Sequence, residues 1–295
     1  MEQKIGVYGL GAMGFGIAQS LLKNGYNIFG YDVNAKQVER LCAEGGKAAA
    51  NVLGFNAVCI VVLNAQQTEQ VLFGQSGVVP TMASGAVVVS CATVDPIFAK
   101  EMEKKCAEYN VLYLDAPISG GAVKAARGAL SVIASGTDDA FIAAAPVLDA
   151  IATTVFKLGD TAGAGSAMKA VNQLLAGVHL AAMAEALTFA MTQGISPEKF
   201  VDVITQCAGT SWMLEDRAPH IVLGDYTPHS SVDIWPKDLG IVLEIAKSVN
   251  FSAPLTTVAL QQFLKASSAG LGREGDAAIA KIYALDAGIT LPGVS

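Results

Sequence analysis

The sequence predicts an α/β protein in which a doubly wound sheet is followed by an all-α C-terminal domain. Three features indicate this fold class. A glycine-rich turn at residues 9–14 lies between a predicted strand and a predicted helix. Strand and helix patterns alternate from there to about residue 158, which is typical of a sheet with parallel central strands. A proline-free stretch from Gly163 to Gly194 then predicts a long helix, and only helical patterns follow it.

Length and composition favour two domains. The chain has 295 residues, of which 52% are hydrophobic and 15% charged, so we expect well-filled cores in residues 1–162 and 163–295. The net charge is −7 and basic residues are not clustered, which excludes a nucleic-acid-binding or anionic-membrane surface. Five scattered cysteines without a C-x-x-C pair predict a reducing, cytoplasmic location. We expect neither a signal peptide nor a membrane span, because a strand begins near residue 5 and the longest uninterrupted apolar stretch is Ala57–Leu63.

The first strand, Ile5–Tyr8, leads into the sequence G-x-G-x-x-G. Gly9 permits the tight turn, Gly11 the approach of a pyrophosphate, and Gly14 the close packing of helix on strand. The free amides at the start of the helix attract phosphate. This stretch predicts a Rossmann dinucleotide-binding domain, with a plain glycine turn as the alternative. The residues expected to contact the cofactor here are Gly9, Leu10, Gly11, Ala12, Met13 and Gly14.

The second strand, Asn27–Tyr31, ends at Asp32, eighteen residues beyond Gly14. A carboxylate at this place accepts hydrogen bonds from the adenosine ribose and repels the 2′-phosphate of NADP. No arginine follows at Val33 or Asn34 to offset that repulsion. We therefore predict NAD as the cofactor, with a solvated turn aspartate as the alternative.

Polar or turn residues follow three of the later strands, at the sheet edge where ligands bind in such folds. Leu63 and Asn64 are expected to contact the cofactor. Thr93 is expected to contact the nicotinamide ribose or the substrate, and its alternative is to cap the helix near Pro96. The later predicted strands are Ala57–Leu63, Ala86–Ser90, Val111–Ala116, Leu130–Ser135 and Thr154–Leu158.

After the strand at residues 111–116, Ser119, Gly120 and Gly121 bring together a hydroxyl and two amides without side chains. Such a turn forms an anion-binding nest of a size that suits a carboxylate. A turn that only leads into the next helix, near Ala122, is the alternative.

The long helix predicted between Gly163 and Gly194 exceeds an ordinary crossover, because about 30 residues at ~1.5 Å each span roughly 45 Å. We expect it to leave the first domain and to become the buried centre of the second. Lys169 and, three residues later on the same face, Asn172 are polar exceptions near its start. A lysine there opposes the helix dipole, which favours a functional role over a solvated surface position.

With these features the chain resembles the β-hydroxyacid dehydrogenases, a family that includes 3-hydroxyisobutyrate, tartronate semialdehyde and threonate enzymes. Four blocks in the same order carry the resemblance across nearly the whole chain. They are GLGAMGFGIAQSLLKNG (9–25), DAPISGGAVKAARGALSVIASG (115–136), GAGSAMKAVNQ (163–173) and KDLG (237–240).

The resemblance implies that Lys169 is the catalytic general acid and base and that Asn172 binds the substrate. It further implies that Ser119, Gly120 and Gly121 hold the substrate carboxylate. Lys237 is implied to close over the cofactor. Many members have a second asparagine where this chain has Gln173, so no role is carried over to that position. The implied activity is NAD-dependent oxidation of a small hydroxy acid by a homodimer or homotetramer.

Two stretches, residues 119–136 and 209–240, most resemble the branch of the family that acts on L-threonate, which implies oxidation at the hydroxyl next to the carboxylate. 3-Hydroxyisobutyrate and D-glycerate are the alternative substrates, and a non-catalytic NAD(P)-binding regulatory protein is the alternative of another class. Three histidines (His179, His220 and His229) lack ligand spacing, so no metal site is expected. Candidates for the pocket, with helix packing as an equal alternative, are Ser211, Trp212, Arg217 and His220.

Lys169 can take the hydroxyl proton of a substrate only when its amine is neutral. A free lysine has a pKa of about 10.4, and a base active near pH 7–8 needs a pKa roughly 2–3 units lower, which corresponds to roughly 3–4 kcal/mol. Burial and the positive nicotinamide lower the lysine pKa, whereas a bound carboxylate raises it.

Overall fold

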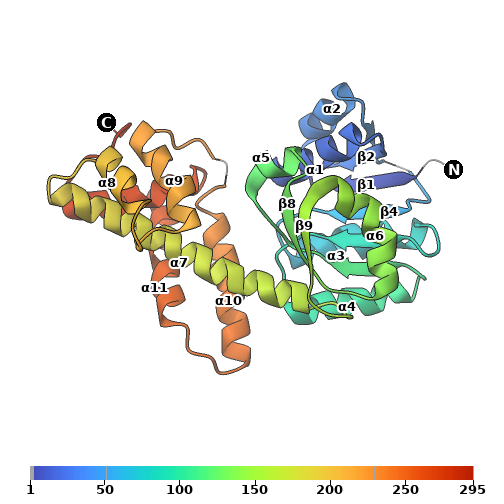
Figure 1. Cartoon of the computed structure of the whole chain (residues 1–295). Coiled ribbons are helices and arrows are strands. Elements are labelled where there is room, and N and C mark those ends of the chain that lie inside the picture. The colour runs from blue at the N-terminus through green and yellow to red at the C-terminus, as the bar shows by residue number, and fades with distance from the viewer. Residues whose placement is uncertain (1–2, 51, 229, 295) are drawn as a thin grey trace. The chain divides into compact units, whose positions relative to one another are not determined.

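The computed structural model describes residues 3–50, 52–228 and 230–294, and it divides into two compact units, residues 1–169 and 170–295. Figure 1 shows the first unit in blue and green and the second in yellow to red. The division falls inside the long helix, whereas the predicted domain boundary at residue 162 lies just before that helix and stays a prediction.

A parallel sheet of six strands forms the centre of the first unit, in the order β3-β2-β1-β4-β5-β6. Successive strands extend the sheet outward from β1 in both directions, so the predicted doubly wound topology is confirmed. The sequence did not predict the short edge strand β3. The strands are β1 (Lys4–Tyr8), β2 (Asn27–Tyr31), β3 (Lys47–Ala48), β4 (Ala57–Ile60), β5 (Val87–Ser90) and β6 (Leu112–Asp115).

Both faces of this sheet are covered, which explains why its central strands are continuous apolar runs. In β4, Cys59 belongs to the hydrophobic cluster formed with α1 and α6, while the neighbouring Val58 belongs to the cluster formed with α4. β5 alternates in the same way, with Val89 on one face and Val88 on the other. The helices of this unit are α1 (Ala12–Lys23), α2 (Ala35–Ala43), α3 (Ala65–Phe73), α4 (Pro96–Ala107), α5 (Gly121–Ala126) and α6 (Asp138–Ile151), with a 3-10 turn at Val79–Thr81.

The last two predicted strands of this unit lie outside the central sheet, which corrects the expected single sheet. They form β8 (Leu130–Ala134) and β9 (Ala152–Lys157), joined by the short β7 (Ile118–Ser119) in a second sheet of order β7-β8-β9. β7 is antiparallel to β8 because the chain turns back after β6. A bridge between Asp115 and Ser135 links the end of β6 to this second sheet.

Helix α1 packs directly on α5 through Gly16. A Cβ atom at Gly16 would lie 2.8 Å from the backbone nitrogen of Ala126 and 2.9 Å from the Cβ of Ala125. Any side chain larger than glycine therefore requires the two helices to separate. The glycine turn and the Ser119–Gly121 turn precede these two packed helices.

The second unit is helical, as predicted, and is built on α7 (Ala164–Thr192), which begins in the first unit. By length and hydropathy α7 passes for a membrane span, but 44% of its most apolar window is buried within the fold. Leu180 and Leu187 are fully buried in the core of the second unit, so core packing accounts for the apolar character of the helix. One side stays open, with Val171 and Leu175 about half exposed, which corrects the expectation of burial all round.

Prolines mark the starts of two of the remaining helices. Ser196 caps α8, whose first residue is Pro197, and Pro254 opens α11, whereas Pro236 lies within the first turn of α10, which begins at Ile234. The elements are α8 (Pro197–Ile204), α9 (Trp212–Leu223), α10 (Ile234–Ser248), α11 (Pro254–Ala266), a π turn (Ser267–Leu271), a 3-10 turn (Asp276–Ile279) and α12 (Ala280–Ala287).

Candidate functional site

The glycine turn has the geometry that a dinucleotide pyrophosphate needs. A Cβ at Gly14 would lie 1.8 Å from the carbonyl oxygen of Gly9, so only glycine lets α1 start this close to β1. A Cβ at Gly11 would meet nothing within 4 Å, which leaves the outer face of the turn open. No side chain caps the start of α1, so its first amides are available to an anion. These residues fit the cofactor that the sequence predicts.

Asp32 lies beside this turn. One carboxylate oxygen accepts a hydrogen bond from the backbone nitrogen of Leu10 at 2.6 Å, and the other accepts one from Asn34 at 2.7 Å. The carboxylate is therefore held against the glycine turn, where the sequence places the adenosine ribose. Its role in cofactor selection stays a prediction.

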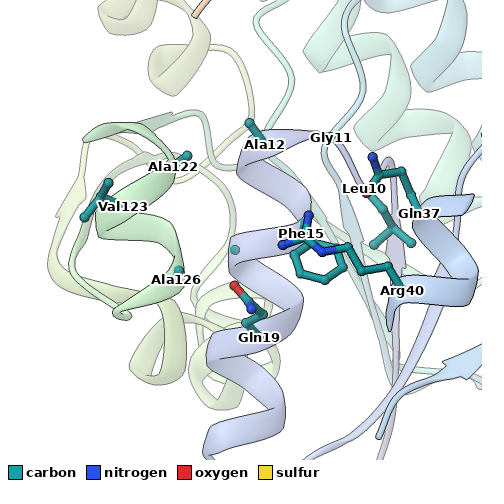
Figure 2. Close-up of a pocket in the computed structure, with 11 residues that line it drawn as sticks. Leu10, Gly11, Ala12, Phe15, Gln19, Gln37, Arg40, Ala122, Val123 and Ala126 are labelled. Atoms are coloured by element: carbon teal, nitrogen blue, oxygen red, sulfur yellow. The ribbon is translucent and has the colours of Figure 1, made fainter. Parts of the chain in front are cut away.

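A cavity of about 480 Å³ opens along α1, between α2 and α5 (Figure 2). Arg40 is its cationic residue, and the guanidinium carbon lies 3.7 Å from the centre of the Phe15 ring. Gln37, one turn earlier on α2, also lines it. The sequence did not single out Arg40, because this residue does not directly follow Asp32 and instead reaches the cavity from the last turn of α2. The i,i+3 spacing of Gln37 and Arg40 on a helix capped by Asn34 is the signal that reveals it.

The ends of β4 and β5 carry the next predicted residues. Asn64 caps α3, since its side chain accepts a hydrogen bond from the backbone nitrogen of Gln67 at 2.9 Å. Leu63 beside it is 54% exposed. Thr93 is half-buried and does not cap α4, because Asp95 takes that place with a 2.7 Å bond from the backbone nitrogen of Ile97. The capping alternative for Thr93 is therefore wrong, and the cofactor or substrate role stays a prediction.

Asp115, at the end of β6, fixes the start of α7. Its carboxylate accepts hydrogen bonds from the backbone nitrogen of Gly163 at 2.9 Å, and from the backbone nitrogen and the hydroxyl of Ser166 at 2.8 and 2.7 Å. Burial raises the pKa of Asp115, and these hydrogen bonds oppose that rise. The sequence did not single out this residue. An aspartate at the end of a buried strand does, however, indicate that hydrogen-bond donors from another segment lie nearby, because a buried carboxylate needs partners.

Lys169 follows Ser166 by three residues on the same helix and contacts strand β7 of the first unit. Its side chain is buried, with 8% of the residue exposed, and Nζ donates a 2.9 Å hydrogen bond to the carbonyl oxygen of Ile118. Ile118 directly precedes Ser119, so the amine lies at the entrance of the predicted carboxylate nest. Gly120 and Gly121 have φ angles of 133° and 78°, a backbone that favours glycine, and α5 begins at Gly121.

Asn172 and Lys237 belong to the second unit and meet in one hydrogen-bonded group. The Asn172 amide donates to Gln173 at 2.9 Å, and the Gln173 amide donates to Asp238 at 2.5 Å. The ammonium of Lys237 lies 2.6 Å from the other oxygen of Asp238. The structure thus gives position 173, to which the sequence assigned no role, two polar partners.

Two of the four pocket candidates of the second unit, Ser211 and Arg217, have structural partners. The Ser211 hydroxyl caps α9, accepting from the backbone nitrogen of Leu214 at 3.1 Å. The Arg217 Nε donates to the buried Asp276 at 2.7 Å, and the indole nitrogen of Trp235 donates to the same carboxylate at 3.1 Å. Trp212 is 51% exposed and His220 half-buried. Among the described residues no group of three His, Cys, Asp or Glu can hold a metal ion; His229 lies outside them.

Models of two protein families together match most of the chain. The NAD binding domain of 6-phosphogluconate dehydrogenase matches residues 4–159. The NAD-binding domain of NADP-dependent 3-hydroxyisobutyrate dehydrogenase matches residues 163–283. These matches show that the chain binds an NAD(P) cofactor, and the choice of NAD over NADP, predicted from Asp32, stays a prediction.

Full-length relatives and solved structures agree with these models. The L-threonate dehydrogenases of Cupriavidus necator and Escherichia coli K12 are 49% and 45% identical, over 99% of this chain and 99% and 97% of theirs. The 2-(hydroxymethyl)glutarate dehydrogenase of Eubacterium barkeri is 35% identical over 98% of both chains. A crystal structure described as 3-hydroxyisobutyrate dehydrogenase from Salmonella typhimurium shares 46% identity and superposes with a TM-score of 0.89, covering 95% of this chain and 100% of that one. The chain therefore belongs to the 3-hydroxyisobutyrate dehydrogenase family of NAD(P)-binding dehydrogenases.

Proposed function

We propose that this chain oxidises L-threonate to the corresponding 2-oxo acid, with Lys169 as the general base. The observation that carries the proposal is the buried amine of Lys169, held 2.9 Å from the carbonyl oxygen of the residue before the Ser119–Gly121 turn. In a 2-hydroxy acid the reacting hydroxyl and the carboxylate are on neighbouring carbons. The amine that removes the hydroxyl proton and the nest that binds the carboxylate therefore have to be neighbours, and the amine contacts the residue directly before the nest.

The chain's own groups divide the reaction among them. NAD(P)⁺, when bound, supplies the hydride acceptor. The Ser119 hydroxyl and the amides of Gly120 and Gly121 are available to bind the carboxylate and orient the alcohol carbon. Lys169, in its neutral form, takes the hydroxyl proton, and in the reductive direction its ammonium returns that proton to the carbonyl oxygen. The carbonyl of Ile118 fixes the direction of the amine.

NAD is the proposed cofactor, because the Asp32 carboxylate is held at the glycine turn and repels a 2′-phosphate. Arg40 lines the neighbouring cavity and works against that preference. We therefore assign the preference for NAD over NADP to Asp32, and expect this preference to be lost when that one carboxylate is removed.

The substrate proposal rests on relatives at 44–49% identity that are named L-threonate dehydrogenases. The name of the Salmonella structure, at 46% identity, favours 3-hydroxyisobutyrate as the second candidate. A purified-enzyme panel of L-threonate, D-threonate, L-erythronate, D-glycerate and 3-hydroxyisobutyrate, each with NAD and with NADP, distinguishes them. L-threonate with NAD should give the largest kcat/KM; a tenfold preference for 3-hydroxyisobutyrate would overturn the assignment.

A cytoplasmic homo-oligomer is the proposed state. The five cysteines are all free, which suits a reducing compartment. Exposed apolar side chains on α7 and α11, among them Val171, Leu175, Leu255 and Val258, favour burial against a second copy. Light scattering coupled to gel filtration measures the mass directly, and a monomer at micromolar concentration would contradict this part of the proposal.

A further inference from the structure

Four side chains of the second unit form one continuous relay. Asn172 Nδ2 donates to Gln173 Oε1 at 2.9 Å, Gln173 Nε2 donates to Asp238 Oδ2 at 2.5 Å, and Lys237 Nζ lies 2.6 Å from Asp238 Oδ1. Adjacent residues of a helix normally point in different directions, so the contact between Asn172 and Gln173 is not a by-product of helix geometry. The side chains of Gln173 and Asp238 are both buried, at 8% and 3% exposure of the residues.

The charge at one end of this relay sets the orientation of every amide in it. Asp238, paired with the Lys237 ammonium, is a carboxylate and offers only acceptors. Gln173 must therefore turn its NH₂ group toward Asp238, which leaves its oxygen for Asn172. Asn172 must in turn give its NH₂ group to that oxygen. The amide oxygen of Asn172 is then the end that faces away from the relay.

We propose that Gln173 and Asp238 are positioning residues that hold Asn172, three residues after Lys169 on α7, with its amide oxygen outside the relay and available to accept a hydrogen bond from the substrate. An oxygen accepts a hydrogen bond and cannot donate one, so the side chain selects acids that carry a hydroxyl besides the one being oxidised. This inference rests on the proposed function, in which Lys169 receives the proton of the reacting hydroxyl and the second hydroxyl is left for Asn172.

The relay also explains why glutamine occupies this position. Gln173 has to reach a carboxylate on α10 with one end and its helix neighbour with the other. Asparagine is one methylene shorter, so it cannot keep both hydrogen bonds at the same backbone separation. An apolar residue of similar length would leave the Asp238 oxygen buried without this donor, which is unfavourable.

Two acids that differ only in the remaining hydroxyls test the proposal: L-threonate and the 2-hydroxybutanoate of the same configuration at C2. Gln173→Met frees the Asn172 amide to turn. We expect KM for L-threonate to rise about 3–10-fold, the effect of one hydrogen bond, with kcat changed less than twofold. The dissociation constant of 2-hydroxybutanoate, measured by calorimetry with NADH bound, should stay within twofold.

A charge swap provides the rescue. Gln173→Glu places two carboxylates in contact and should weaken L-threonate binding further. Adding Asp238→Asn to it restores a donor at position 238, and the glutamate then still accepts from Asn172, so the amide oxygen keeps its direction. The double variant should recover L-threonate KM to within about threefold of wild type. Gln262→Met, on α11 and outside the relay, is the matched control and should behave as wild type.

The wild-type protein supplies a measurement that needs no variant to fold. In ¹⁵N spectra the side-chain amide protons of Gln173 should be shifted downfield and exchange slowly, because they face a carboxylate. Equal loss of affinity for both acids in Gln173→Met, or failure of the double variant to recover, would overturn the inference. An inactive wild type or a fully active Lys169 variant would instead overturn the proposed function.

Discussion

The Nζ atom of Lys169 lies 2.9 Å from the carbonyl oxygen of Ile118, so a side chain of α7 is tied to the strand that leads into the Ser119–Gly121 turn. Lys169→Ala removes the only group assigned to move the proton. We expect turnover to fall by at least a hundredfold, because general acid–base catalysis contributes about 10²–10⁴-fold. Fluorescence titration with NADH should give a dissociation constant within twofold of wild type. More than a tenth of wild-type activity in this variant would end the assignment.

Replacing Asp32 should change the choice of cofactor. In Asp32→Ser the repulsion of the 2′-phosphate disappears, together with the acceptor for the ribose and for the Leu10 nitrogen. We expect the ratio of kcat/KM for NADP over NAD to rise about 100-fold, near 3 kcal/mol in differential binding. A further Arg40→Gln change should lower NADP affinity again. Asp160→Ser, at an exposed carboxylate, serves as control and should leave the ratio unaltered.

Gly14→Ala should damage both folding and cofactor binding. The new Cβ would lie 1.8 Å from the Gly9 carbonyl oxygen, so α1 has to move away from β1. We expect a lower melting temperature and at least a tenfold weaker NADH affinity. Gly240→Ala is the matched control, because a Cβ at that helical position meets nothing within 4 Å, and it should be neutral or slightly stabilising. Equal melting temperatures for the two variants would contradict the packing argument.

Asp115→Asn should destabilise the protein by about 1–3 kcal/mol at pH 7, because an amide nitrogen would face the donors of Gly163 and Ser166. Burial raises the pKa of Asp115 above its ordinary 3.8, so the folded protein keeps this proton to a higher pH than the unfolded chain does. The contribution of this proton to the free energy of unfolding is fully present below pH 3.8 and is lost as the pH rises through the raised pKa.

The difference in unfolding free energy between wild type and Asp115→Asn should therefore widen as the pH falls from 7 toward 4. Urea unfolding at several pH values measures it. A gap that narrows on acidification would mean that the hydrogen bonds to Asp115 outweigh its burial and lower the pKa instead.

Much of the fold was predictable from local chemistry. The three glycines of the turn predict both the backbone conformation between β1 and α1 and the kind of ligand bound there. Asp32 ends the second strand at the spacing from Gly14 that is typical of such domains. The proline-free stretch from residue 163 predicted α7 almost to its ends. Lys169 could be singled out because burying a charged side chain in an apolar helix is unfavourable unless that side chain is paired or has a function.

The features that the sequence did not predict depend on contacts between distant segments. The strands β3 and β7 have two residues each, which is too few to show the alternating pattern of a strand. β8 pairs with β7, a segment that follows the turn at Pro117, and is not part of the sheet that contains β6. Asp115 reaches Ser166 across more than fifty residues of chain. Gln173 differs from the family pattern, and only the position of Asp238 shows what its extra length does.

The absence of a side chain at Gly16 has a consequence for how the substrate specificity of this protein can change. Because α1 and α5 touch backbone to backbone there, the two turns that precede them, which we propose hold the cofactor and the substrate carboxylate, are spaced by helix contact and not by adaptable side chains. A new substrate cannot be accommodated by shifting one turn relative to the other. Changes in specificity have to come from the side chains that line the substrate, while the reach from nicotinamide to carboxylate stays constant.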